Sequence, residues 1–69
     1  MKNWAVCGDK SGFYWSAYGK ITDENSETIF IFNETSGEIE TWDKKNSKIV
    51  RFDNRADAKG LYKEEYQHK

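Results

Sequence analysis

The chain has 69 residues, with 11 basic and 12 acidic side chains and a net charge of −1. Its length predicts one domain, residues 1–69, and its charge lacks the basic excess of a typical duplex-DNA binder. Its single cysteine, Cys7, excludes an internal disulfide. With one histidine, the chain also lacks the ligands of a closed zinc site. We therefore expect no metal and no other cofactor.

The cellular location follows from what the sequence lacks. No stretch approaches the roughly 20 apolar residues of a membrane span. No secretory signal is visible, and the lone thiol fits a reducing compartment. These features predict a soluble cytoplasmic protein with no membrane partner.

Five short runs have the composition of β-strands, and turn-forming residues separate them. In chain order, the predicted strands are Trp4–Cys7, Phe13–Tyr18, Thr28–Phe32, Glu38–Trp42 and Lys48–Phe52. Short connections favour antiparallel neighbours. The sequence therefore predicts an α+β domain with an antiparallel meander of about five strands, for which curling into a half-barrel is one alternative.

A single helix follows the last predicted strand. Asn54 and Asp57 have the spacing of a capping box, which marks a helix N-terminus. Apolar residues then recur at helical spacing, at Ala58, Leu61, Tyr62 and Tyr66. A helix of about three to four turns can cover at most one face of the sheet. We expect it to pack on one face as the C-terminal element.

The last two predicted strands carry apolar residues on both faces. Closing them as a hairpin about Lys45 and Asn46 pairs Trp42 with Ile49, Thr41 with Val50, and Glu40 with Arg51. Because side chains alternate along a strand, each face has its own set. One face carries Ile39, Thr41, Val50 and Phe52, and the other carries Glu40, Trp42, Ile49 and Arg51. The first set suits a core under the helix.

The second apolar face then needs an explanation, because one helix cannot cover both. The sheet can curl and bury both sets of side chains. The domain can instead form a homodimer through the second face, or that face can bind something else.

Catalytic groups are not apparent in the sequence. The histidine, His68, lies beside the C-terminus, where chains fray. Cys7 has apolar neighbours, as expected of a small buried hydrophobic residue. We therefore predict that the protein is not an enzyme.

The segment Ser11–Gly19 mixes Tyr, Trp, Ser and Gly, the composition of many binding surfaces. Aromatic side chains on a sheet can also stack unpaired bases, if a basic groove lies beside them. Such a groove requires Lys10, Lys20, Lys44, Lys45, Lys48 and Arg51 to cluster. The candidate binding residues are Tyr14, Tyr18, Trp42, Ile49, Arg51, Lys44 and Lys45.

Two segments resemble a group of small bacteriophage accessory proteins. They are Val50–Ala58, in which a last strand delivers Phe52 to a capped helix, and Trp4–Val6 followed by Gly12–Tyr14. A fainter likeness is to the N-terminal hybrid-binding domain of ribonuclease H, although the middle of this chain lacks that family's Trp and second helix. The first resemblance implies a phage protein, a group rich in inhibitors of host enzymes and defence systems.

These observations predict a non-catalytic binding module. The first expectation is a phage-encoded inhibitor that binds and occludes a protein in the host cytoplasm through Tyr14, Tyr18 and Trp42. The first alternative is a module that binds single-stranded or hybrid nucleic acid. The second alternative is a homodimer that binds a small ligand.

Overall fold

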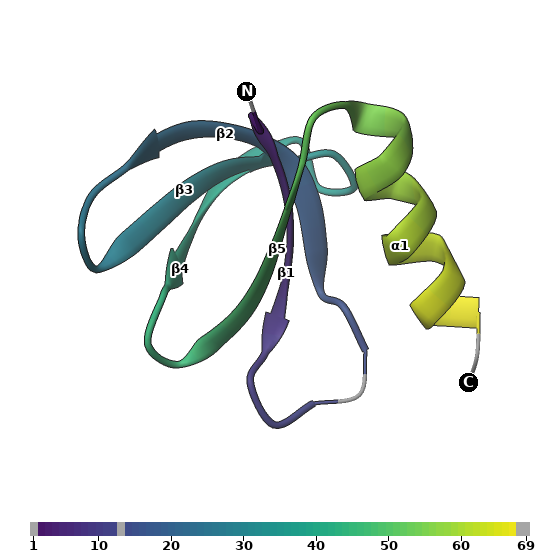
Figure 1. Ribbon diagram of the computed structural model, residues 1–69, viewed down its shortest axis with the longest axis horizontal. Coiled ribbons are helices and arrows are strands. Elements are labelled where there is room, and N and C mark those ends of the chain that lie inside the picture. The colour runs from purple at the N-terminus through teal and green to yellow at the C-terminus, as the bar shows by residue number, and fades with distance from the viewer. Residues whose placement is uncertain (1, 13, 68–69) are drawn as a thin grey trace.

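The computed structural model describes residues 2–12 and 14–67, without the side chains of residues 64–67. Its elements are β1 (Trp4–Asp9), β2 (Ala17–Glu24), β3 (Thr28–Asn33), β4 (Glu38–Asp43), β5 (Ser47–Phe52) and α1 (Arg55–Gln67) (Figure 1). The predicted α+β fold, an antiparallel sheet with one C-terminal helix on one side, is confirmed. Among the described residues, no helix has the length and apolar character needed to cross a bilayer. Phe13 and His68 lie outside the described residues.

The strand order in the sheet is β4-β3-β2-β1-β5, with every neighbouring pair antiparallel. The predicted hairpin pairing between the last two strands was wrong, because β5 pairs with β1 from Trp4↔Phe52 to Asp9↔Ser47. The physical reason lies in β1. Ala5, Val6 and Cys7 are fully buried, so the backbone of β1 needs hydrogen-bond partners on both edges.

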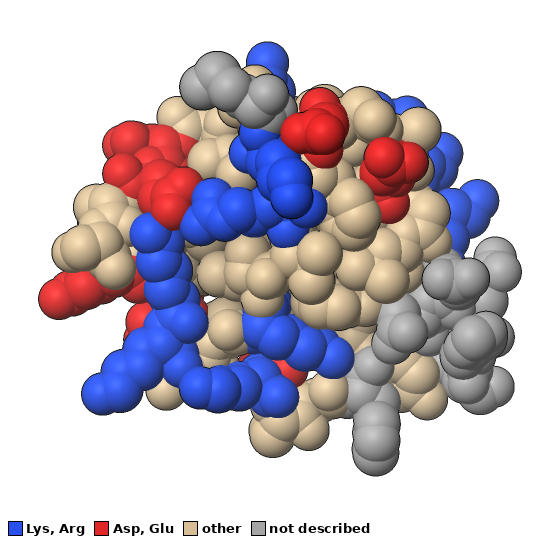
Figure 2. All heavy atoms as spheres, viewed as in Figure 1, with Lys and Arg blue, Asp and Glu red and all other residues tan. Residues whose placement is uncertain are grey.

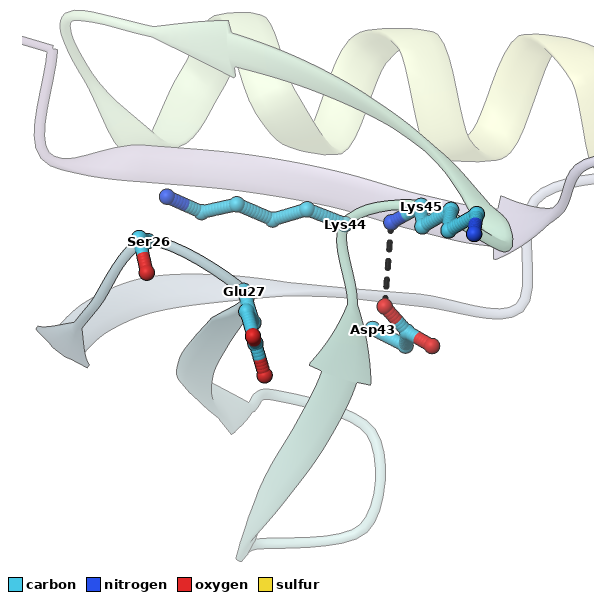
Figure 3. Close-up of a pocket in the computed structure, with 5 residues that line it drawn as sticks. All are labelled: Ser26, Glu27, Asp43, Lys44 and Lys45. Atoms are coloured by element: carbon cyan, nitrogen blue, oxygen red, sulfur yellow. Dashed lines mark hydrogen bonds between the residues drawn. The ribbon is translucent and has the colours of Figure 1, made fainter.

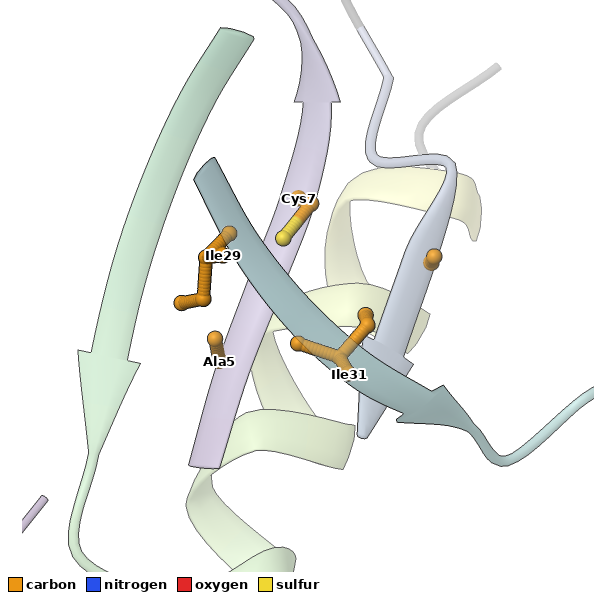
Figure 4. Close-up of a cluster of buried hydrophobic side chains, with 5 residues drawn as sticks. Ala5, Cys7, Ile29 and Ile31 are labelled. Atoms are coloured by element: carbon orange, nitrogen blue, oxygen red, sulfur yellow. The ribbon is translucent and has the colours of Figure 1, made fainter. Parts of the chain in front are cut away.

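Curling of the sheet produces two apolar cores on its two faces. The inner core consists of Ala5, Cys7, Ala17, Ile29 and Ile31, with Ile21, Trp42 and Ile49 packed against it (Figure 4). The outer core, under α1, consists of Val6, Tyr18 and Ala58, with Trp4, Trp15, Phe52, Leu61 and Tyr62 packed against it. The sheet itself therefore encloses one apolar set, and α1 covers part of the other.

The predicted grouping of side chains by face is correct, and α1 packs on the predicted face, that of Phe52, but it covers only part of that face. Trp42 and Ile49 share the inner face and pack against its core. Ile39 and Val50, predicted to lie under the helix, are 61% and 37% exposed. The reason is that α1 contacts β1, β2 and β5, so it covers Phe52 but does not reach Ile39 on β4.

The second strand begins later than predicted, at Ala17 instead of Phe13, and it runs on through the predicted turn to Glu24. Tyr14 and Trp15 have high β-propensity, yet they lie in the loop after β1. Gly8 allows this loop to come close, because a Cβ at Gly8 would lie 2.9 Å from the Tyr14 carbonyl oxygen. Burial of Trp15 against the outer core therefore overrides the local strand preference.

The N-terminus of α1 has the predicted cap. The backbone N–H of Asp57 donates to Oδ1 of Asn54 at 2.9 Å, and Nδ2 of Asn54 donates to Oδ2 of Asp57 at 3.2 Å. Ala58 is fully buried, and the Tyr62 ring packs 4.9 Å from the Tyr18 ring, centroid to centroid. The predicted apolar face of the helix is thus confirmed at Ala58, Leu61 and Tyr62, while the Tyr66 side chain is outside the described part.

Candidate functional site

Cationic side chains from three separate segments gather on one side of the protein (Figure 2). We call these cations the basic band: Lys10, Lys44, Lys45, Lys48 and Arg51. Lys48 lies over Trp15 on the outer face, whereas Arg51, two positions after the inner-facing Ile49, pairs with Glu24. Nζ of Lys10, in the β1–β2 loop, donates to the carbonyl oxygen of Lys45, in the β4–β5 turn, at 3.2 Å. Nζ of Lys48 donates to the carbonyl oxygen of Gly12 at 2.9 Å. The curl of the sheet therefore joins residues that lie 35 or 36 positions apart.

One carboxylate, that of Glu24, is held between two members of the basic band. Arg51 donates to it with both terminal nitrogens, at 2.8 and 2.7 Å, and Nζ of Lys44 lies 2.6 Å from Oε2. These hydrogen bonds lower the pKa of Glu24 to about 2, and the same contact raises the pKa of Arg51. Lys10 and Lys48 donate to neutral carbonyl oxygens instead, so no carboxylate offsets their charge in these contacts.

Replacing Glu24 by Gln should make the protein less stable at pH 7 than the unchanged chain, with a smaller difference at pH 3. The pKa of Glu24 is about 2 when folded, against an ordinary value of 4.5. Its ionised form thus contributes stability above pH 4.5, and that contribution is lost as the pH falls towards 2. Because the Glu24 and Arg51 side chains are 32% and 36% exposed, the expected loss is about 1 kcal/mol or less.

Urea unfolding of both chains at pH 7 and pH 3 checks this prediction. An equal loss of stability at the two pH values would show that the ionised carboxylate is not what stabilises the contact. Ser26→Ala is a suitable control in the adjoining turn, because Ser26 is exposed and uncharged.

The aromatic residues of the Ser11–Gly19 segment have three different environments. Tyr14 is 40% exposed in the β1–β2 loop. Trp15 is half-buried against the outer core, and Nζ of Lys48 lies 4.5 Å from its ring centroid. Tyr18 is buried under α1 beside Tyr62. Tyr14 is therefore the aromatic side chain of this segment with the largest described exposure.

The structure places three of the seven candidate binding residues in the basic band. Lys44, Lys45 and Arg51 belong to the basic band, and Tyr14 precedes the Trp15 ring that Lys48 covers. The other three, Tyr18, Trp42 and Ile49, face the two cores. The site list from the sequence lacked Lys10, Lys48 and Glu24. The sequence offered a reason to consider Lys10 and Lys48, because both belong to the set of cations that a basic groove requires. It offered no such reason for Glu24.

A polar pocket of about 480 Å³ adjoins the basic band (Figure 3). Its lining residues are Ser26, Glu27, Asp43, Lys44 and Lys45. The backbone N–H of Lys44 donates to the carbonyl oxygen of Glu27 at 2.9 Å, which ties the two turns together. A carboxylate oxygen of Asp43 accepts from the backbone N–H of Lys45 at 3.0 Å. Two lysines and two carboxylates line the pocket, so the lining alone selects neither anions nor cations.

The described residues offer little chemistry for catalysis. Burial raises the pKa of the Cys7 thiol to about 12, and the nearby Glu40 carboxylate adds to the effect. The thiol is therefore protonated at neutral pH and is a poor nucleophile. Within the described part of the chain, no group of three or more His, Cys, Asp or Glu side chains could hold a metal ion.

A second surface feature lies on β3 and β4. Phe32 and Ile39 sit directly opposite each other in the β3–β4 pairing. They point to the outer face, where they are 40% and 61% exposed. We call these two residues the apolar pair. The sequence alone did not single it out, because Ile39 was assigned to the core under the helix.

Comparison with known proteins adds no relative. No protein family, curated protein or solved structure matches this chain. The resemblances to small bacteriophage proteins and to the hybrid-binding domain of ribonuclease H therefore stay predictions. The surface of the molecule is the basis for assigning a function.

Proposed function

We propose that the domain is a non-catalytic module that binds single-stranded nucleic acid on the basic band. One observation carries the proposal: five cations from three segments converge on a protein whose net charge is −1. Cations that neutralise phosphates supply most of the affinity of such binders. Exposed aromatic side chains add base stacking, which is the role we assign to Tyr14.

Single strands suit this surface better than duplexes. The overall charge does not provide the broad positive field typical of a duplex binder. Glu24 compensates part of the charge on Lys44 and Arg51, so Lys10, Lys45 and Lys48 are assigned the phosphate contacts. A flexible strand can follow such a short path and place a base on Tyr14. The neighbouring pocket could accept a polar group of the same ligand.

Affinity for a labelled oligonucleotide should fall steeply between 50 and 200 mM salt, as expected for about two or more phosphate contacts. Replacing both Lys10 and Lys45 by Ala should weaken binding and reduce the slope of log affinity against log salt by about 1.4, from about 0.7 per contact. Fluorescence anisotropy measures both quantities.

The control is the replacement of Lys59 and Lys63 by Ala, because this substitution also removes two positive charges, but from α1. If both double variants bind with the same affinity and slope, binding is a general charge effect and the basic band is not the site. Base stacking on Tyr14 is tested separately, by comparing the affinity of the Tyr14→Ser chain with that of the unchanged chain at high salt.

The apolar pair supports a second candidate function, the binding of a host protein expected from the phage resemblance. Aromatic and aliphatic side chains exposed together are typical of protein interfaces. If this proposal holds, replacing Phe32 and Ile39 by Ser should abolish capture of a partner from bacterial lysate, while the Lys10 and Lys45 variant still captures it. If the Lys10 and Lys45 variant loses the partner and the Phe32 and Ile39 variant keeps it, the partner binds to the basic band.

A further inference from the structure

The two edge strands of the sheet, β4 and β5, have one unpaired edge each. They follow each other in the chain with only residues 44–46 between them, yet they lie at opposite ends of the strand order. Within the described residues, no ladder of backbone hydrogen bonds joins them. Unpaired N–H and C=O groups on an edge strand are able to pair with another strand.

The two edges have opposite charge. β4 carries Glu38, Glu40 and Asp43, whereas β5 carries Lys48 and Arg51. An antiparallel alignment that sets Trp42 beside Ile49 also sets Asp43 beside Lys48 and Glu40 beside Arg51. Opposite charges and apolar side chains in directly opposing positions stabilise strand pairing. Pairing of β4 with β4 would bring together only acidic charges, and pairing of β5 with β5 only basic ones.

The outer face of these strands gives an independent reason for an edge partner. Ile39 is 61% exposed on β4, and Val50 is 37% exposed on β5. The same alignment places Ile39 beside Phe52 and Val50 beside Thr41. Pairing would therefore cover apolar area that α1 leaves uncovered, because α1 packs mainly on β1, β2 and β5.

We propose that two copies of this chain associate edge to edge, with β4 of one copy paired antiparallel to β5 of the other. Within one copy the two strands lie at opposite ends of the strand order and do not pair with each other. Reciprocal pairing uses both free edges of each copy and closes at two copies. The proposal rests on the edges and not on nucleic-acid binding: Lys10 and Lys45 lie outside the paired segments, although Lys48 and Arg51 of the basic band lie on β5.

Sedimentation equilibrium of the unchanged chain is the first measurement, and it should give twice the mass of the single chain. The alignment is tested by mixing a Thr41→Cys chain with a Val50→Cys chain under mild oxidation. Opposing positions in antiparallel strands are close enough for a disulfide, so a cross-linked pair should form. Because Cys7 is fully buried, its thiol does not compete with the introduced cysteines for disulfide formation.

Two control mixtures make the result specific. A Ser36→Cys chain, with its thiol in the β3–β4 turn, should lose the cross-link to the Val50→Cys chain. Oxidation of the Thr41→Cys chain alone should give no cross-linked pair. A single-chain mass at every concentration overturns the proposal. So does a dimer in which Thr41→Cys links to itself but not to Val50→Cys, because that result would mean β4 pairs with β4.

Discussion

Replacing Gly19 by Ala is expected to leave the chain without a stable fold. A Cβ at Gly19 would lie 1.7 Å from the carbonyl oxygen of Phe32 and 2.6 Å from its carbonyl carbon. Both atoms belong to the backbone of β3, so a side-chain rotation cannot relieve the clash. Gly19 also pairs with Ala5 on its other side, which leaves β2 no room to move away.

The expected cost of this methyl group is about 3 kcal/mol or more. A domain of this size has a total stability of about 3 to 10 kcal/mol, so most or all of it would be lost. Circular dichroism and urea unfolding measure the effect. Gly60→Ala is the matched control: no atom lies within 4 Å of its Cβ position, and it should gain about 1 kcal/mol in the helix. A Gly19→Ala chain with an unchanged urea midpoint would contradict the close approach of β2 and β3.

Replacing Ile31 by Ala should destabilise the domain by about 2 to 5 kcal/mol. Ile31 is fully buried in the inner core, where it lies with Ile29 opposite Ala5 and Cys7 of β1 (Figure 4). The substitution removes buried methyl groups and leaves a cavity that a curled sheet cannot easily close. Urea unfolding at pH 7 gives the free energy directly.

Ile39→Ala is the matched control, because it removes the same atoms from a side chain that is 61% exposed. Its expected cost is about 0.5 kcal/mol or less. Equal losses for the two variants would mean that the inner face is not the core. The comparison therefore tests which face of β3 and β4 is buried, because the sequence had also placed Ile39 in a core.

Small side chains on β1 and β2 explain how such a short chain can enclose a core. Ala5, Cys7 and Ala17 line the inner face, and each is fully buried. A strongly curved sheet brings these strands close to β3, and only small residues fit between the isoleucines of β3 and the opposite wall. The same curl carries the β4–β5 turn to the β1–β2 loop, which forms the basic band.

Local patterns in the sequence determined the helix, its cap at Asn54 and Asp57, four of the five strands and the grouping of Trp42 with Ile49 on one face. Each of these depends on neighbours a few positions apart, through hydrogen-bond spacing or the alternation of side chains. This is why they could be predicted without any knowledge of distant contacts.

Only the tertiary structure decided that β5 pairs with β1, that the face carrying Trp42 is the inner core, and that Lys10 meets the β4–β5 turn. A buried strand needs hydrogen-bond partners along both of its edges. Here the buried β1 required a second neighbour besides β2, and β5 supplies it. Side-chain alternation is the same whichever face becomes the core. The choice of face and the clustering of distant cations therefore depend on the curl of the whole sheet.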